Sequence, residues 1–208
     1  MTMDGAQPGR LAEEDRALVA ACLAGERAAQ RRLFEREKRR VHATLYRIAG
    51  HNRGMDDMLQ DTWITVFRSL HQFRGDAKLS TWIDRCAVHV ALRHLKQQRK
   101  DRRHGDAELE AHEEAWAERR MGLREAVARL YDVLALLDEK QRIAYVLHVL
   151  EGRALKEVAT LTEASVVATK VRIFRARREV ERRAQRDPLL AEFVAEGPEL
   201  QHGEEADA

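Results

Sequence analysis

Several residue types that mark particular protein classes are scarce in this chain. Two cysteines, Cys22 and Cys86, and three prolines occur among its 208 residues. Two isolated thiols exclude a small secreted scaffold held together by disulfides. Both lie in helical patterns beside apolar residues, so we predict free core thiols in a reducing cytoplasm. The shortage of proline leaves long helices uninterrupted.

Signals for a metal site, a membrane segment and a catalytic centre are also lacking. The nine histidines show no zinc-ligand spacing, no apolar run approaches the length of a membrane span, and MTMDGAQPGR has no signal-peptide core. The sequence has no glycine-rich phosphate loop, no HExxH motif and no carboxylate pair with a plausible pocket. We therefore predict a cytoplasmic protein that is not an enzyme, uses no cofactor or metal and does not insert into a membrane.

Aromatic residues make up only 5% of the chain, whereas charged residues make up 35%. This balance favours small helical modules over one large aromatic-rich core. The formal net charge of +2 says little, but the distribution of charge is uneven. Residues 93–104 hold six Lys/Arg and one acid, and residues 165–186 hold eight Lys/Arg and two acids. By contrast, residues 105–118 hold six acids and no Lys/Arg. Basic segments separated by acidic ones favour a polyanionic partner, although basic runs are often merely solvated.

Apolar periodicity predicts helices throughout, and strand-like alternation is absent. The first half predicts helices over Asp15–Leu23, Glu26–Ala49, Asp56–Leu70 and Thr81–Arg99, with Asp56 as the cap of the third. The predicted buried stripe of the second helix is Phe34, Val41, Leu45 and Ile48, and that of the third is Leu59, Trp63, Val66, Phe67 and Leu70. The pattern fades after Arg99 and resumes at Leu123. The second half then predicts helices over Asp138–Leu150, Leu155–Leu161 and Ser165–Arg183, with Asp138 as the cap of the first of them.

These patterns predict an all-α fold of two small helical modules joined by a flexible linker. The linker follows from an acidic stretch without apolar periodicity. The predicted segments are an N-terminal tail at 1–14, a first module at 15–99, the linker at 100–121, a second module at 122–186 and an acidic tail at 187–208.

The polar loop FRGDAKLSTW, residues 73–82, has an aromatic residue at each end and leads into a two-sided helix. Steps of about 100° per residue separate a cationic stripe from an apolar face. The stripe comprises Trp82, Arg85, His89, Arg93, Lys96 and Lys100, and the apolar face Leu79, Ile83, Cys86, Ala87 and Val90. Single-stranded nucleic acid suits such a stripe because bases stack on rings while cations follow phosphates. A plain solvated face is the alternative.

The three short helices over residues 138–183 have the tight connections of a helix-turn-helix. On the last helix the predicted packed face is Val166, Thr169, Ile173, Ala176 and Val180. The opposite face carries Val167, Lys170, Val171, Phe174, Arg175, Arg178 and Arg182. Such a face fits a DNA major groove, where apolar side chains touch thymine methyls and cations reach phosphates or guanine. An ordinary amphipathic surface helix is the alternative.

The two modules together resemble a known family. MDDMLQDTWITVFRSLHQFRGDAKLSTWIDRCAVHVALRHLKQQR is similar to sigma region 2 of bacterial RNA polymerase sigma factors, particularly the extracytoplasmic-function group. LDEKQRIAYVLHVLEG and KVRIFRAR resemble sigma region 4, a helix-turn-helix. The resemblance implies an initiation factor that binds core RNA polymerase through its β′ and β subunits and directs transcription from a subset of promoters. It also allows for an anti-sigma partner, although no residue here shows one.

The resemblance also implies roles for individual residues. Docking on the coiled-coil clamp of β′ would use Asp57, Gln60 and Asp61. Capture of melted minus-ten DNA would use Phe73, Arg74, Trp82, Arg85, His89, Arg93 and Lys96. Reading of the minus-thirty-five element would use Val167, Lys170, Val171, Phe174, Arg175 and Arg178. Phe73 and Trp82 would brace a loop that holds a flipped-out base, with plain packing as the alternative role of Trp82.

Four positions depart from the family pattern. His89 stands where Asn is common, the turn LTEAS lacks the usual glycine, and Asp138 replaces a proline. Ala154 stands where a Ser or Thr cap is expected, which costs about 1 kcal/mol of helix stability. We therefore expect a less stable region 4 or an altered specificity.

Two other functions remain open at this point. One is a helix-turn-helix DNA-binding regulator acting without polymerase, which would not need the acidic surface of the Asp56–Leu70 helix. The other is a sigma-like decoy limited to protein interaction. A decoy would not need the eight basic residues at and near the last helix, over residues 165–186.

Overall fold

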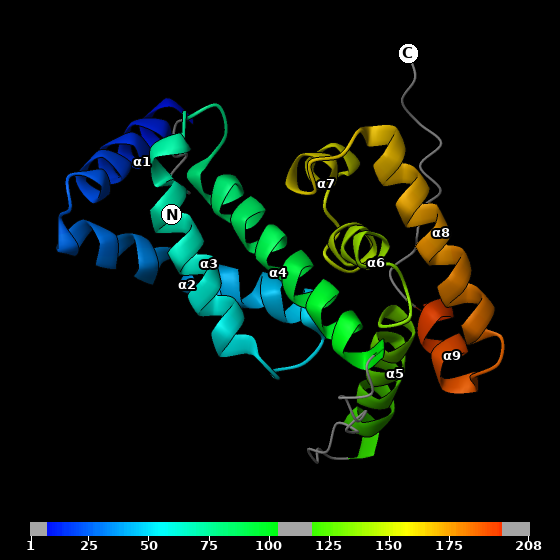
Figure 1. Ribbon diagram of the computed structural model, residues 1–208. Coiled ribbons are helices and arrows are strands. Elements are labelled where there is room, and N and C mark those ends of the chain that lie inside the picture. Colours follow the sequence, from blue (N-terminus) through cyan, green and yellow to red (C-terminus); the bar gives the residue numbers. More distant parts are fainter. Residues whose placement is uncertain (1–7, 104–117, 197–208) are drawn as a thin grey trace, which may run out of the picture. The chain divides into compact units, whose positions relative to one another are not determined.

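The computed structural model describes residues 8–103 and 118–196, with side chains over 13–101 and 124–192. All regular secondary structure in these ranges is helical (Figure 1). The chain divides into two compact units, one formed mainly by residues up to Gln97 and the other mainly by residues from Gln98 onward. The predicted all-α fold of two helical modules is confirmed. Most of the predicted linker falls on residues 104–117, outside the described residues.

The first unit is built from long helices. They are α1 (Pro8–Leu23), α2 (Arg27–Ala49), α3 (Met55–Ser69), the short 3-10 helix η1 (Leu70–Gln72) and α4 (Leu79–Arg103). α2 packs against both α1 and α3, and α1 also contacts η1. α1 begins at Pro8 rather than at Asp15, so the range predicted as an N-terminal tail already contains helix.

The turn into α3 differs from its prediction. Gly54, at φ 69°, precedes the helix, which begins at Met55. Asp56, the predicted cap, instead lies in the first turn, where its charge faces the positive end of the helix dipole. A left-handed backbone is cheap only for glycine, so Gly54 fixes the direction in which α3 leaves the turn.

The core of the first unit uses one face of each helix. The predicted apolar face of α4 is confirmed, because its five residues are at most 8% exposed. Val41, Leu45 and Ile48 of α2 are fully buried as predicted. Phe34, predicted on the same stripe, is 36% exposed because its ring packs against Trp63 at the surface between α2 and α3.

The buried face of α3 is also rotated from its prediction. Trp63, Val66 and η1 residue Leu70 are buried, but Leu59 and Phe67 are only half-buried. Met55, Met58 and Thr62 take up the remaining core positions. Residues predicted for the core therefore line a surface groove instead.

The second unit comprises shorter helices. They are α5 (Glu118–Leu134), α6 (Glu139–Tyr145), the π-helix η2 (Val146–Leu150), α7 (Leu155–Leu161), α8 (Val166–Ala184) and α9 (Pro188–Glu196). α6 and η2 together occupy the single helix predicted over Asp138–Leu150. As predicted, Asp138 caps α6, and its carboxylate accepts a hydrogen bond from the Lys140 N–H at 3.0 Å.

Helix α9 lies in the range predicted as an acidic tail. The Asp187 carboxylate accepts a hydrogen bond from the Leu190 N–H at 3.3 Å and pairs with Arg129 at 2.9 Å. Leu190 is 1% exposed, and α9 packs on α5 and α8. An aspartate followed by proline is a common helix start, since proline lacks the N–H that would be unpaired there. The second unit thus extends beyond Arg186.

Candidate nucleic-acid interfaces and an apolar groove

The loop between η1 and α4 holds its two aromatic ends in contact. The ring centroids of Phe73 and Trp82 lie 5.9 Å apart with planes at 68°, an edge-to-face arrangement. Gly75 between them has φ 81°, and a Cβ there would lie 3.2 Å from Arg16 Nε. The positive φ therefore favours glycine here, and a Cβ would also crowd the Arg16 side chain. The contact joins the two ends of the loop, and the role of this pair in bracing a captured base stays a prediction.

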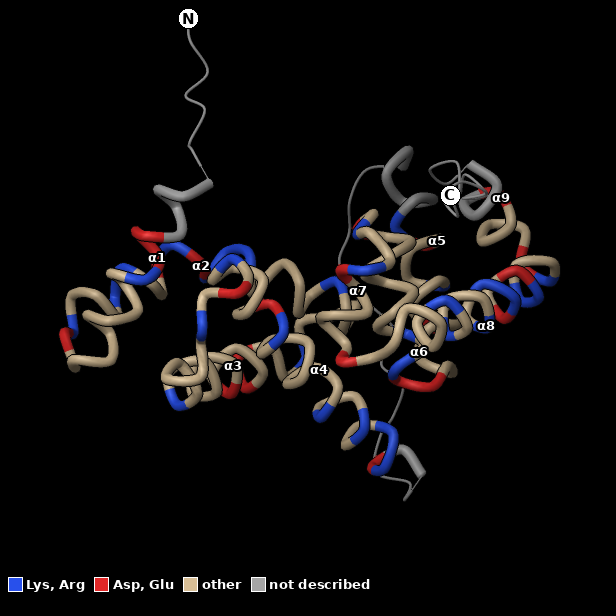
Figure 2. Tube along the Cα trace, turned by 90° about the horizontal axis from the view of Figure 1, so that it is seen from above, with Lys and Arg blue, Asp and Glu red and all other residues tan. Residues whose placement is uncertain are grey.

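The cationic stripe lies along α4 after this loop. Arg93, Lys96 and Lys100 are exposed, and so is the loop residue Arg74. The other stripe residues, Trp82, Arg85 and His89, are partly exposed. Figure 2 shows basic residues recurring along the C-terminal half of α4. The structure thus places the predicted minus-ten residues on the loop and on one solvent-facing side of α4.

The three α3 residues expected to dock on polymerase have different surroundings. Asp57 and Gln60 are exposed. Asp61 is tied to α4, because its Oδ2 lies 2.9 Å from His94 Nε2. Its side chain is still 49% exposed, so it presents a carboxylate edge to solvent as well.

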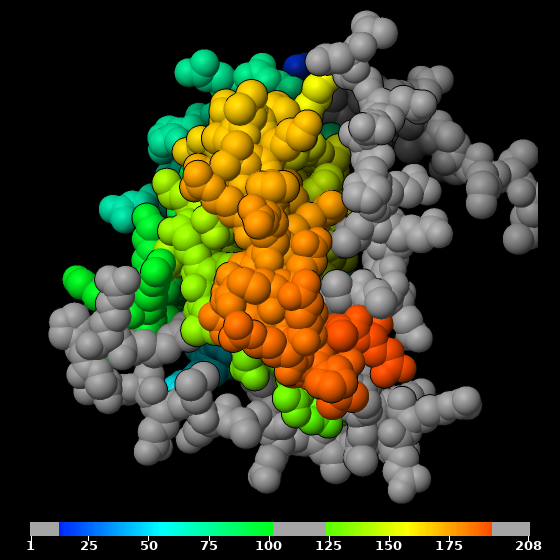
Figure 3. Space-filling view, turned by 90° about the vertical axis from the view of Figure 1, so that its right-hand side faces the viewer, coloured from blue at the N-terminus to red at the C-terminus, as the bar shows by residue number. Residues whose placement is uncertain are grey.

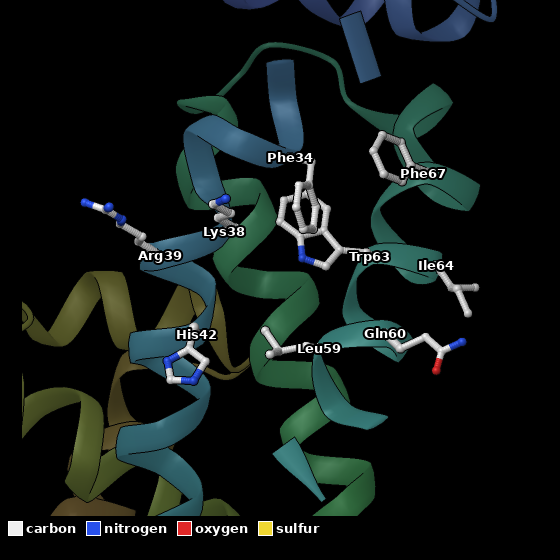
Figure 4. Close-up of a pocket in the computed structure, with 9 residues that line it drawn as sticks. All are labelled: Phe34, Lys38, Arg39, His42, Leu59, Gln60, Trp63, Ile64 and Phe67. Atoms are coloured by element: carbon white, nitrogen blue, oxygen red, sulfur yellow. The ribbon is translucent and has the colours of Figure 1, made fainter. Parts of the chain in front are cut away.

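An apolar groove with a volume of about 860 Å³ lies beside Gln60 (Figure 4). Its walls are Phe34, Lys38, Arg39 and His42 from α2 and Leu59, Gln60, Trp63, Ile64 and Phe67 from α3. The rings of Phe34 and Trp63 lie 4.8 Å apart, and the Lys38 ammonium lies 5.8 Å from the Phe34 ring centre. Gln60 is the one residue of this groove that the sequence predicted to be functional. The signal in the sequence that pointed to the groove was Ile64, an apolar residue outside the predicted buried stripe of α3. In the structure Ile64 is 53% exposed.

Helices α7 and α8 form the predicted helix-turn-helix, and their turn is strained. Glu163 has φ 48°, the single non-glycine residue with positive φ among those described. It occupies the glycine-free turn LTEAS. A left-handed conformation costs a residue with a Cβ about 1–2 kcal/mol. Ser165 then caps α8, its Oγ accepting a hydrogen bond from the Ala168 N–H at 3.1 Å.

The start of α7 has ion pairs in place of a side-chain cap. Ala154 offers only its carbonyl, which accepts from the Val158 N–H at 3.0 Å. Arg153 pairs with Glu151 at 2.6 Å and with Glu157 in the first turn at 2.9 Å. These pairs fix the chain before the helix and offset part of the missing cap.

Helix α8, orange in Figure 3, lies at the surface of the second unit, and its outward face combines apolar and basic side chains. Val167, Val171 and Phe174 are 73%, 42% and 58% exposed. Lys170, Arg175 and Arg178 are also exposed, and the Arg178 guanidinium lies 5.9 Å from the Phe174 ring centre. The predicted packed residues Thr169, Ile173, Ala176 and Val180 are buried. Val166, predicted among them, is 40% exposed, because it lies in the first turn, ahead of the buried positions.

Among the residues that the structure describes, no group of three or more His, Cys, Asp or Glu side chains has a metal-holding arrangement. None of the helices in the same ranges has the length and apolarity needed to span a membrane.

Comparisons with known proteins agree with this arrangement. The family model for sigma-70 region 2 matches residues 33–101, and that for sigma-70 region 4 matches residues 128–180. An RNA polymerase sigma-H factor of Pseudomonas aeruginosa is 28% identical over 192 residues, covering 86% of this chain and 97% of the relative. The extracytoplasmic-function sigma factor SigM of Mycobacterium tuberculosis is 30% identical over 174 residues, covering 81% and 84%.

Two solved structures share the fold. CnrH, solved in complex with the cytosolic domain of CnrY, gives a TM-score of 0.57 at 23% identity and covers 83% of this chain and 98% of that one. RpoE of Bartonella quintana, solved with the anti-sigma factor NepR, gives a TM-score of 0.54 at 16% identity, and the match covers 76% of this chain and 97% of RpoE. With both regions matched in order on the two helical units, the chain belongs to the extracytoplasmic-function group of the sigma-70 family of RNA polymerase sigma factors.

Proposed function

We propose that this sigma factor divides promoter recognition between its two units. The α2–α3 face docks on core polymerase, the loop after η1 and the stripe of α4 hold the melted minus-ten strand, and α8 reads the duplex minus-thirty-five element. The observation that carries the proposal is the presence, in one chain, of an aromatic-headed cationic stripe and a mixed apolar and basic helix face. The protein is cytoplasmic and makes no bonds itself; the polymerase does the chemistry.

Docking on the β′ clamp is supported by the groove and the acids beside it. Asp57, Gln60 and Asp61 lie on α3, and Gln60 also lines the groove. Exposed apolar side chains such as Ile64 favour burial by a partner, while neighbouring carboxylates add charge selectivity. A helical element of the polymerase would fill the groove with apolar side chains and meet the acids with basic ones.

Capture of the melted strand is supported by the chemistry of the α4 stripe. Bases freed from stacking find the partly exposed Trp82 ring, while Arg93 and Lys96 lie further along the same face for phosphates. His89 occurs where the family commonly has Asn, so we propose that the minus-ten preference differs from that of the usual family members.

Duplex reading by α8 is supported by its outward face. Val167, Val171 and Phe174 can meet thymine methyl groups in a major groove, with cations on either side for phosphates or guanine. An anti-sigma partner is also proposed. The support is that RpoE of Bartonella quintana was solved with one.

The deciding experiment is transcription in vitro with core polymerase on a promoter library. The sigma factor should direct initiation at a distinct promoter subset, and Asp57→Lys should reduce both core binding and transcript yield. A regulator acting without polymerase would shift DNA alone and give no core-dependent transcripts. A decoy would bind core polymerase and give no transcripts at all.

A further inference from the structure

The first turn of α4 is held by a side chain from α1. Asp15 Oδ2 accepts a hydrogen bond from the Leu79 N–H at 3.2 Å, across 64 residues of sequence. Leu79 is the first residue of α4, and the N–H groups of a first turn have no partner within their own helix. Asp15 therefore acts as a cap supplied by another helix. Figure 1 shows α1 beside the loop that leads into α4.

Asp15 is itself fixed by α2. Its other oxygen, Oδ1, lies 2.9 Å from Arg36 Nη2, and its side chain is only 17% exposed. Arg36 Nε in turn donates to Glu37 Oε1 at 2.9 Å. Glu37 is 6% exposed, so the chain of contacts runs from the loop end into the interior.

A second arginine of α2 completes the connection. Arg40 Nε donates to Glu37 Oε2 at 2.9 Å, and Arg40 Nη2 donates to the Ser80 carbonyl at 2.8 Å. Arg40 also pairs with Asp84, which is 3% exposed on α4. Leu79 and Ser80 at the start of α4, and Asp84 further along the helix, are thus attached to one network of ion pairs.

The loop itself meets the same helix. The Arg16 guanidinium lies next to Gly75, since a Cβ built there would be 3.2 Å from Arg16 Nε. Phe73, at the start of the loop, packs on Trp82, which lies one turn into α4. The loop is therefore bounded on one side by α1, and it leads into a helix start that the ion-pair network holds in place.

Stability alone does not account for these buried charges. A buried ion pair contributes little more than apolar residues of the same volume, because both partners lose water. Its directional hydrogen bonds do fix the positions of the groups that it joins.

We propose that Asp15, Arg36 and Arg40 are positioning residues for strand capture. They hold the first turn of α4, and with it Trp82 and the loop over residues 73–78, in the geometry that receives an extruded base. The inference rests on the proposed role of this loop. Extruding a base costs a few kcal/mol, and a receptor that must also become ordered on binding would add to that cost.

The test uses holoenzyme and forked promoter DNA with a single-stranded minus-ten strand. Affinity is measured for the intact strand and for strands carrying one abasic site at each minus-ten position in turn. Wild type should prefer the intact strand to at least one abasic strand. Asp15→Ala should lose about five- to tenfold of that preference, which is within the typical net effect of losing one intramolecular hydrogen bond. Its affinity for the abasic strand should stay within about twofold, because the α4 stripe is unchanged.

Matched variants separate positioning from folding. Glu13→Ala removes an exposed acid of the same helix and should keep the wild-type preference. Asp15→Asn retains an acceptor for the Leu79 N–H and loses the ion pair with Arg36, so its preference for the intact strand should fall between those of wild type and Asp15→Ala. Arg36→Gln breaks the same ion pair from α2, so it should lose as much of this preference as Asp15→Asn does.

Three results would overturn the inference. Retention of the wild-type preference by both Asp15→Ala and Arg36→Gln would mean that the network positions nothing. An equal loss of affinity for intact and abasic strands by both variants, together with a loss of core binding, would be the pattern of a purely structural role. A wild type that prefers the intact strand at no position would reject the proposed role of the loop as well.

Discussion

The edge-to-face contact between Phe73 and Trp82 joins the two ends of the loop that precedes α4, with ring centres 5.9 Å apart. Trp82 is partly exposed, so packing on Phe73 leaves part of the indole open to solvent. Trp82 can therefore both pack on Phe73 and offer a surface on which a base stacks, so its two predicted roles are compatible.

Replacing Trp82 should separate these two roles. Trp82→Ala should reduce the permanganate reactivity of unpaired thymines at the promoter and lower the free energy of unfolding by about 1 kcal/mol, a typical value for an aromatic pair. Trp82→Phe keeps a ring and should retain most of both properties. Equal open-complex yields for Trp82→Ala and wild type would leave the residue with packing alone.

The α2–α3 groove should be required for core polymerase binding. Ile64→Asp places a charge on its wall and should weaken core binding at least about tenfold, because a buried apolar contact becomes a desolvated carboxylate. Leu23→Asp is the matched control, since Leu23 on α1 is 52% exposed and Ile64 is 53% exposed. Pull-down with core polymerase and circular dichroism would be measured together. Equal binding by the two folded variants would place docking elsewhere.

The basic faces of α8 and α4 should act at different stages. Arg175→Ala and Arg178→Ala should weaken holoenzyme binding even to a promoter held closed. Each lost phosphate contact should reduce the salt slope by about one. Arg183→Ala, whose guanidinium pairs with Glu179 at 2.7 Å, should change closed binding little and serves as the control.

Arg93→Ala and Lys96→Ala on α4 should show the complementary defect. Closed binding should be largely spared, while permanganate reactivity of the minus-ten thymines falls, because these cations meet phosphates only after melting. A melting defect from the α8 variants together with a closed-binding defect from the α4 variants would reverse the two assignments.

Strain in the helix-turn-helix should be relieved by Glu163→Gly. Glu163 has φ 48°, a conformation that glycine adopts without a Cβ penalty. Glu163→Ala is the control, since it removes the same carboxylate and keeps the Cβ. Urea unfolding should find Glu163→Gly more stable than Glu163→Ala by about 1 kcal/mol. The strain assignment would be wrong if the alanine variant were equally stable.

Glu179 should contribute a small acid-dependent stability to α8. Hydrogen bonds from Arg182 and Arg183 lower its pKa from 4.5 to about 2. A lowered pKa means that the folded state favours the carboxylate, so this stability is present above pH 4.5 and is lost as the pH falls toward 2. The group is near the surface, so solvent screening keeps the effect below about 1 kcal/mol.

Urea unfolding at pH 6 and near pH 2 would measure this effect. Glu179→Gln should be less stable than wild type at pH 6, and the difference should vanish near pH 2. Glu181→Gln, on an exposed acid of the same helix, should show a smaller change. A constant difference between Glu179→Gln and wild type at both pH values would contradict the assigned pKa.

The sequence by itself determined most of the helical segments and which face of most helices is buried. The apolar side of α4 and four of the five predicted packed positions of α8 are buried as their spacing requires, because the helical repeat places residues three and four apart on one face. The helix starts at Asp138 and Ser165 were also readable, since a cap acts within its own turn. The start of α9 at Asp187 carried the same signal, but the acidic composition beyond it led to the prediction of a tail.

Only the tertiary structure decided which apolar residues remain uncovered and which charges meet. Phe34 has the spacing of a core residue, yet no neighbouring helix covers it fully, so it forms a groove with Trp63. The bond between Asp15 and the Leu79 N–H joins residues 64 positions apart, beyond the reach of any local pattern. Periodicity fixes directions around one helix axis, whereas grooves and ion-pair networks depend on where several helices come together.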